Sequence, residues 1–319
     1  MARWAICGVL GPICAAMLMT TAQADQPAIP RIGVLAAPVP YEDGLRDGLA
    51  KLGYAEGKSI AIDWRRSAGA VDELRSLAID LGRSKPDLIV VFGTLGTRTV
   101  LQVTTLPVVF LSSDPVGSGL VTNLARPGGN ATGVSSTGPE LTAKRVELLR
   151  QFAPRARRIG CLVNTSNPVG ALQLEQAERA ARALGVELVK FDTRSEAELD
   201  AALRAIPRGA LDALLVTGDN LLFASRAKIV GVVRKAGLPA MFPIKEFRGG
   251  VLVSYGPSIR EAGRMTAAYV DKILRGAKPG DLPVEEVSKV ELVIDLRVAH
   301  EQGIKVPEEL LYRADEVIR

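Results

Sequence analysis

The stretch Asp87-Leu-Ile-Val-Val-Phe-Gly93-Thr94 has the composition of a buried parallel strand that ends in a glycine turn. The stretch Asp212-Ala-Leu-Leu-Val-Thr-Gly218-Asp219 repeats this pattern in the second half of the chain. In both halves a helical stretch follows and leads to a strand that begins with Leu-Pro, at Leu106–Phe110 and at Leu238–Phe242. The repeat predicts two similar lobes, each built from a strand, a glycine turn, a helix and a second strand.

Short apolar runs alternate with amphipathic stretches on both sides of this pattern. The expected strands are Ile32–Ala36, Ile60–Trp64, Leu88–Phe92, Val108–Leu111, Ile159–Val163, Val186–Phe191, Ala213–Thr217, Ala240–Phe242, Val251–Ser254 and Val290–Ile294. The expected helices are Asp43–Leu52, Ala70–Arg83, Gly96–Val103, Leu141–Phe152, Gly170–Leu184, Glu196–Ala205, Leu221–Ala236 and Ile259–Arg275. Such alternation predicts an α/β fold with open parallel sheets.

The composition is that of a globular protein with about two domains, at 319 residues, 47% hydrophobic and 24% charged. The net charge of +5 comes from 40 basic and 35 acidic residues that are dispersed along the chain. A nucleic-acid surface needs clustered basic residues and usually stacking aromatics, and only 4% of the residues are aromatic. We therefore expect no nucleic-acid partner.

Catalytic and cofactor motifs are missing from the sequence. His300 is the single histidine, which argues against a Ser-His-Asp catalytic triad, a Cys-His catalytic pair and a His-rich zinc site. The glycine segments at Gly93 and Gly117 lack dinucleotide-binding spacing, and no Walker A lysine motif occurs. We expect no enzyme activity, no catalytic residues, no cofactor and no metal.

Residues 1–24 have the features of a secretory signal peptide. Arg3 supplies a positive charge, an apolar run follows, and Ala22-Gln23-Ala24 is a cleavage site before Asp25. The apolar run is too short for a membrane span and is interrupted by Gly11-Pro12. Export to the periplasm is expected. Cleavage leaves Cys161 as the one thiol, in an apolar strand where we expect a structural role.

Polar residues follow four of the expected strands. They are Gly93-Thr94, Ser112-Ser113-Asp114, Asn164-Thr165-Ser166-Asn167 and Gly218-Asp219-Asn220. Ligands of open α/β sheets bind beyond the carboxyl ends of the strands, and N–H groups at helix starts attract anions such as a carboxylate. Each loop alone is compatible with simple helix capping. Four such loops in two facing lobes favour a polar cleft.

Two segments are distinctive, Asp114-Pro-Val-Gly-Ser-Gly-Leu-Val121 and Ala125-Arg-Pro-Gly-Gly-Asn-Ala-Thr-Gly-Val134. They resemble the periplasmic substrate-binding proteins of ABC transporters related to tryptophan- and tyrosine-uptake binding proteins, which have the type 1 periplasmic binding fold. Further similar segments are Leu52–Lys58, Ser254–Pro257, Tyr269–Pro279, Asp281–Val284, Leu292–His300, Gly303–Pro307 and Ala314–Ile318.

The resemblance implies two Rossmann-like lobes with parallel sheets joined by a hinge. One lobe then holds residues 30–136 with 256–284, and the other holds 137–255 with 285–319. The implied crossovers lie near Val134–Gly138, Tyr255–Pro257 and Pro283–Val287. The loops Ala37–Tyr41 and Thr94–Pro107 are shorter than is usual in the family, which leaves room for a ligand other than an aromatic amino acid. Asp295 stands where the family more often has Asn.

We therefore expect a monomeric, periplasmic solute-binding component of an ABC importer. It would close around a small polar molecule, an amino acid or a related compound, and deliver it to the permease in the inner membrane. Asp114 and Asp219 are expected to hold a ligand amine, and Thr94, Thr132 and Asn164 a carboxylate or hydroxyls. The expected ligand-binding residues are Tyr41, Gly93, Thr94, Ser112, Asp114, Thr132, Asn164, Asn167, Asp219, Asn220 and Tyr255.

Two other functions stay open at this point. The same cleft suits a ligand-sensing module that signals to a membrane receptor. A periplasmic hydrolase that uses Asp114 or Asp219 is disfavoured by the lone histidine and by the absence of a G-x-S-x-G nucleophile motif from the sequence.

Overall fold

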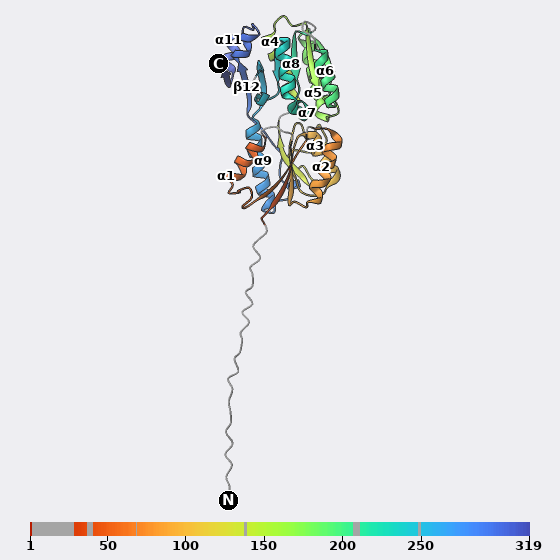
Figure 1. Cartoon of the computed structure of the whole chain (residues 1–319), viewed down its shortest axis with the longest axis vertical. Helices are drawn as coiled ribbons and strands as arrows, with labels where there is room; N and C mark the ends of the chain where they lie inside the picture. The colour runs from red at the N-terminus through yellow and green to blue at the C-terminus, as the bar shows by residue number, and fades with distance from the viewer. Residues whose placement is uncertain (2–28, 37–40, 68, 137–138, 207–210, 248–249) are drawn as a thin grey trace.

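The computed structural model describes Met1 and residues 29–36, 41–67, 69–136, 139–206, 211–247 and 250–319. They form two α/β lobes, one above the other in Figure 1. The first sheet has the order β11 (Glu285–Glu286), β5 (Ala131–Ser135), β4 (Val108–Ser112), β3 (Leu88–Phe92), β1 (Arg31–Ala36), β2 (Ala61–Arg66). The second has the order β13 (Glu316–Ile318), β12 (Val290–Asp295), β10 (Val253–Pro257), β9 (Ala240–Phe242), β8 (Ala213–Val216), β6 (Arg158–Val163), β7 (Glu187–Asp192).

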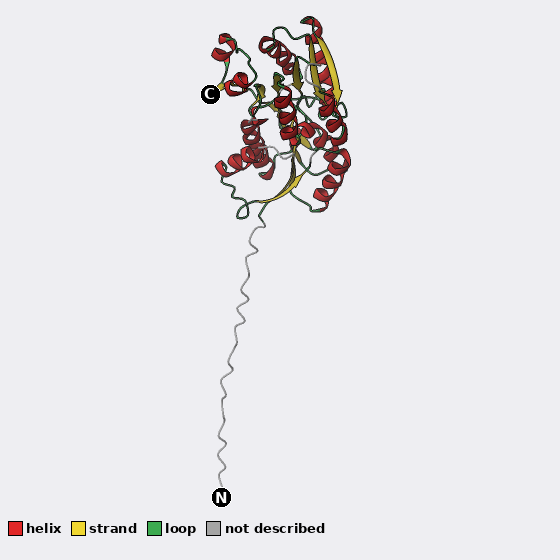
Figure 2. Cartoon of the chain, turned by 45° about the horizontal axis from the view of Figure 1, so that its top comes forward, coloured by secondary structure: helices red, strands yellow, loops and turns green. Residues whose placement is uncertain are grey.

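Helices cover both faces of each sheet, and Figure 2 shows this alternation of strands and helices in both lobes. In the first lobe, α1 (Tyr41–Lys51) and α9 (Ile259–Leu274) lie opposite α2 (Val71–Arg83) and α3 (Thr94–Val103) (Figure 1). In the second, α4 (Glu140–Phe152) and α5 (Pro168–Ala183) pack in one core, and α6 (Glu196–Ala205) and α8 (Arg226–Ala236) in another. Short elements are α7 (Asn220–Ala224), α10 (Leu296–Glu301), α11 (Glu308–Arg313) and the 3₁₀ turns η1 (Lys245–Phe247) and η2 (Pro279–Asp281).

The two lobes repeat one arrangement, because the order β2-β1-β3-β4-β5 in the first sheet corresponds to β7-β6-β8-β9-β10 in the second. The repeated aspartates have the same role. The carboxylate of Asp87 accepts a hydrogen bond of 2.7 Å from the N–H of Arg31 at the start of β1. That of Asp212 accepts bonds of 2.7 and 2.9 Å from the N–H groups of Arg157 and Arg158 at the start of β6. The α/β fold with two similar lobes is thus confirmed.

Some elements differ from expectation. β12 runs antiparallel to β10 in an otherwise parallel sheet, because the chain returns from β11 without a crossover helix. β5 was not expected, since Gly133 interrupts its apolar pattern; a Cβ there would lie 2.0 Å from the Phe110 carbonyl oxygen, so β4 and β5 need this glycine. The expected helix Leu221–Ala236 is divided at Ser225 into α7 and α8.

The chain passes between the lobes after β5, after β10 and after β11. Gly256 and Pro257 still pair with β12 in the second sheet, and Glu285 and Glu286 pair with β5 in the first. The sheets therefore end two residues beyond the boundaries that we expected at 256 and 284.

The expected signal peptide lies, except for Met1, outside the described residues. Within the ranges that the structure describes, the helices are all too short or too polar to cross a membrane.

Candidate functional site: a polar cleft between the lobes

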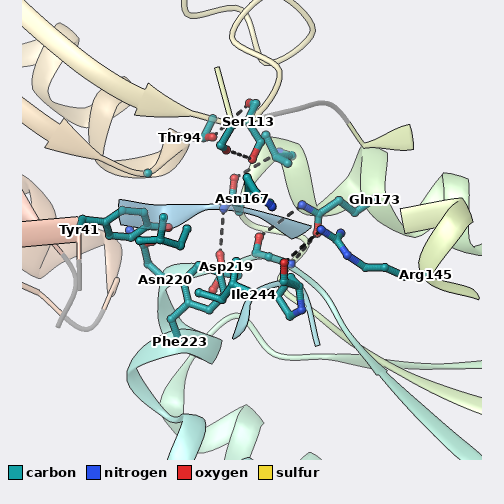
Figure 3. A pocket seen from close by; sticks show the side chains of 17 residues that line it. Tyr41, Thr94, Ser113, Arg145, Asn167, Gln173, Asp219, Asn220, Phe223 and Ile244 are labelled. Carbon is teal, nitrogen blue, oxygen red and sulfur yellow. Dashed lines mark hydrogen bonds between the residues drawn. The ribbon is translucent and has the colours of Figure 1, made fainter. Parts of the chain in front are cut away.

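A cavity of about 60 Å³ lies between the lobes, beyond the carboxyl ends of β3 and β8 (Figure 3). Many separate segments of the chain line this cavity, because the parallel strands of a sheet all end at the same edge. Its lining from the first lobe and the neighbouring crossover consists of Tyr41, Gly93, Thr94, Ser113, Ser136, Pro257 and Ile259. Its lining from the second lobe consists of Arg145, Asn167, Val169, Gln173, Gly218, Asp219, Asn220, Phe223, Pro243 and Ile244.

The first-lobe wall presents hydroxyls and a helix start. The Thr94 and Ser112 hydroxyl oxygens lie 2.7 Å apart, and those of Ser113 and Ser136 lie 2.9 Å apart. Gly93 is the N-cap of α3 and has no side chain with which to satisfy the first N–H groups of that helix. This wall therefore offers hydrogen-bond donors and the positive end of a helix dipole.

The second-lobe wall presents the carboxylate of Asp219, which is 4% exposed. It is the N-cap of α7 and accepts a 2.9 Å bond from the N–H of Leu221. The side-chain amide of Asn167 donates at 2.9 Å, and that of Asn164 at 3.3 Å. Burial nevertheless raises the pKa of Asp219, although these donors act in the opposite direction. The donors of the protein thus compensate the negative charge of this carboxylate incompletely.

Arg145 places a buried positive charge at the same cleft. It projects from α4 and is 5% exposed. Its guanidinium donates to neutral oxygens: the carbonyls of Tyr255 at 2.7 Å and Pro243 at 3.4 Å, and the Thr142 hydroxyl at 3.5 Å. Burial lowers the pKa of Arg145 to about 10, so the side chain stays charged at neutral pH. An anionic ligand group is the electrostatic complement of this charge.

A direct hydrogen bond joins the two lobes at the cleft. The side-chain amide of Asn220 donates a 3.1 Å hydrogen bond to the carbonyl of Phe92 in the opposite lobe. Gly93 follows Phe92 with a φ of +109°, and a Cβ at this residue would lie 2.4 Å from the Asn220 amide nitrogen. Only glycine therefore lets the two loops approach so closely without strain.

The family model for ABC transporter substrate binding proteins matches residues 37–318. The chain belongs to this family. A tyrosine-binding protein of Clostridioides difficile is 27% identical over 256 residues, which are 79% of this chain and 73% of the relative. The family resemblance seen in the sequence is thereby confirmed.

Two solved structures are similar to this substrate-binding protein over almost the whole chain. One is an ABC domain from Streptococcus pneumoniae in complex with L-Trp, 30% identical with a TM-score of 0.83, covering 91% of this chain and 100% of that one. The other is a conserved domain protein from Vibrio cholerae, 29% identical with a TM-score of 0.83, covering 90% and 99%. They support the two-lobe periplasmic binding fold.

Six of the expected ligand-binding residues of this substrate-binding protein line the cleft: Tyr41, Gly93, Thr94, Asn167, Asp219 and Asn220. Ser112 and Asn164 lie behind it, where they hold Thr94 and Asp219.

The other three expected residues have their contacts elsewhere. Asp114 has a φ of +42°, which turns its carboxylate back to the N–H of Gly117 at 2.8 Å. Thr132 donates to the carbonyl of Leu282 at 2.8 Å, and Tyr255 contributes the carbonyl that Arg145 holds.

Arg145 is the main cleft residue that was not predicted from the sequence. A signal for it exists, because Arg145 shares a helical stripe with the buried residues Thr142, Leu149 and Phe152. A charged residue in a buried stripe needs either a partner or a function.

The described residues include no group of three or more His, Cys, Asp or Glu side chains arranged to bind a metal ion.

Proposed function

We propose that this protein is the monomeric, non-catalytic binding component of a periplasmic ABC import system and that it captures a small zwitterion, an amino acid or a related molecule. Membership of the substrate-binding family supports the transport role. The names of its relatives support the ligand class, since one is called a tyrosine-binding protein and another was solved with L-Trp.

The observation that carries the proposal is the opposite charge of the groups around one small cleft. Asp219 is buried with a raised pKa, and a ligand ammonium group would offset the cost of that burial. The first turn of α3, the hydroxyls of Ser113 and Ser136, and the charge of Arg145 favour a carboxylate. A zwitterion would pair its ammonium group with Asp219 and its carboxylate with the other groups.

Binding is coupled to closure because the two walls belong to different lobes. A ligand that bridges Asp219 and the start of α3 adds contacts to the Asn220–Phe92 bond that exist only when the lobes are together. The ligand therefore shifts the population toward the closed form, which a permease recognises. The hinge of this proposal consists of the crossovers after β5, β10 and β11.

Export completes the proposed function. The periplasmic form begins at Asp25, after removal of residues 1–24. Mass spectrometry of the protein from the periplasm tests this, and a membrane-retained chain that keeps its N-terminus contradicts it.

The binding role is tested with Asp219→Asn and, as a matched control, Asp114→Asn. Asp114→Asn keeps the side-chain oxygen that accepts the hydrogen bond from the N–H of Gly117, so its thermal midpoint should not change. Asp219→Asn keeps an oxygen for the N–H of Leu221 but turns an amide NH2 group toward the amide donors of Asn164 and Asn167, so its midpoint should fall by roughly a few degrees. Loss of a charged hydrogen bond of about 1.5–3 kcal/mol should weaken ligand binding roughly 10- to 150-fold in Asp219→Asn, with little change in Asp114→Asn. Isothermal titration against a panel of amino acids measures this. Equal affinities in the two variants would show that Asp219 is only a cap.

A further inference from the structure

Tyr41 occupies one end of the cleft and is held there firmly. It is the first residue of α1, it is 8% exposed, and it lines the cleft in Figure 3. Its ring stacks on that of Phe92, with centroids 5.0 Å apart and planes 12° apart. Phe92 is itself 1% exposed and lies at the end of β3, so the tyrosine ring cannot move deeper into the first lobe.

The helix that carries Tyr41 is also fixed. A Cβ at Gly44 would lie 2.4 Å from the carbonyl oxygen of Arg260 on α9, and a Cβ at Gly263 would lie 2.7 Å from the carbonyl oxygen of Tyr41. The backbones of α1 and α9 thus touch at glycines on both helices. A shift of α1 that would withdraw the ring from the cleft would break this packing, which is costly in a close-packed interior.

The space that remains beside the ring is small. The cavity of about 60 Å³ compares with about 300–1,000 Å³ for pockets that hold drug-sized ligands. A single water already needs about 10–15 Å³. Ile244 and Ile259 enclose the cavity beside Tyr41, and both are nearly fully buried. A cavity of this volume leaves little room for an indole or phenol ring beside a zwitterionic head group.

We propose that Tyr41 is a specificity-determining residue that fills the place of a ligand ring, so that the cleft selects amino acids with short side chains, such as glycine, alanine and serine. This inference rests on the proposed function, and it separates this protein from relatives whose names refer to tyrosine or tryptophan. The phenol ring of Tyr41 occupies the space that the ring of an aromatic ligand would need, as a bulky side chain does at the end of a selective pocket.

The test compares wild-type protein, Tyr41→Ala and the control Tyr312→Ala by isothermal titration with glycine, alanine, serine, tyrosine and tryptophan. Tyr312 is 88% exposed and is not part of the cleft lining, so its removal controls for loss of a tyrosine. Wild-type protein and Tyr312→Ala should bind the best short amino acid at least about tenfold more tightly than tyrosine or tryptophan, because overpacking a filled site is penalised. Tyr41→Ala should narrow or reverse this preference.

The comparison within the wild-type protein decides the question even if Tyr41→Ala fails to fold. Wild-type protein that binds tyrosine or tryptophan as tightly as alanine overturns the inference and leaves the proposed function intact. A folded Tyr41→Ala variant with no gain for aromatic ligands also overturns it. If wild-type protein binds none of the five, this inference is overturned, and the wider amino-acid panel then decides the proposed function separately. Preference for a short amino acid, relaxed in Tyr41→Ala, supports both.

Discussion

The turn after β3 and the turn after β8 occupy the same place in the two lobes but differ in chemistry. Both begin with glycine, at Gly93 and Gly218, and both lead into a helix. The next residue is Thr94 in one lobe and Asp219 in the other. The first turn offers a hydroxyl and helix N–H groups, whereas the second offers a buried carboxylate. The same turn of the repeated arrangement thus carries a neutral donor group in one lobe and a carboxylate in the other.

The glycines themselves also differ. Gly93 has a positive φ, and a Cβ there would meet Asn220 of the other lobe at 2.4 Å. Gly218 is not among the residues with positive φ, and the nearest atom to its Cβ would be the Gln173 side-chain nitrogen at 3.4 Å. The first glycine therefore allows contact between the lobes, whereas the second lines the cavity from its own lobe and has no such contact.

Alanine at these two positions gives the largest expected contrast. Gly93→Ala should lower ligand affinity roughly 10- to 100-fold, because it strains the backbone by about 1–2 kcal/mol and displaces the Asn220–Phe92 bond between the lobes. Gly218→Ala should change affinity by no more than about threefold, since the contact it adds is ordinary. Isothermal titration measures both, and equal losses would mean that Gly93 has no special role in closure.

The carboxylate of the second turn should make binding depend on pH. In the free protein burial raises the pKa of Asp219, and a bound ammonium group would lower it again, so binding releases a proton in the window between the two values. Affinity should therefore fall as pH decreases through the raised pKa, by up to about tenfold per pH unit, and stay level above it. Because the pKa of Asp219 is raised in the folded state, protonation of this carboxylate stabilises the fold at low pH. This stabilisation is lost as pH rises through the raised pKa.

Asp219→Asn is the matched control for this experiment, because it replaces the titrating carboxylate with an amide that does not titrate. A series of titrations from about pH 4 to pH 8 should show the slope in wild-type protein and a nearly flat response in Asp219→Asn. A slope that survives in the variant would assign the pH dependence to another group.

Most of the architecture could be predicted from the sequence, and less of the site. Alternating apolar runs and glycine turns are local signals, and they are sufficient to predict β3, β8 and the turn residues Thr94 and Asp219. The position of Arg145 at the cleft depends on how α4 packs against the carbonyls of Tyr255 and Pro243, which are distant in sequence. The direction of the Asp114 carboxylate depends on a positive φ that an Asp-Pro pair does not reveal.

A smaller contrast is expected between the repeated aspartates at the starts of the lobes. Asp212 accepts two backbone N–H bonds, which lower its pKa, whereas the carboxylate of Asp87 accepts one. Asp212→Ala should therefore cost about 1–2 kcal/mol of stability and lower Tm by roughly 3–6 °C, and Asp87→Ala about half of that. Because the folded-state pKa of Asp212 is lowered, its contribution is present above its unfolded pKa and is lost as pH falls. Thermal melts at neutral and acidic pH check both statements.

The smallest effect is expected at the one pair of strand positions where the lobes differ by a thiol. Val34 in β1 corresponds to Cys161 in β6, within the similar stretches Arg31-Ile-Gly-Val-Leu and Arg158-Ile-Gly-Cys-Leu, and both side chains are fully buried. Burial raises the pKa of the Cys161 thiol to about 12, so the reactive thiolate is disfavoured. Cys161→Val, which copies the first lobe, should shift Tm by no more than about 2 °C and leave affinity within about twofold. Cys161→Ser is the matched control, since a hydroxyl in this apolar core should cost about 1–3 kcal/mol. Rapid alkylation of the native thiol, or loss of ligand binding in Cys161→Val, would contradict this structural role. Either result would show that Cys161 has a function that Val34 in the first lobe does not have.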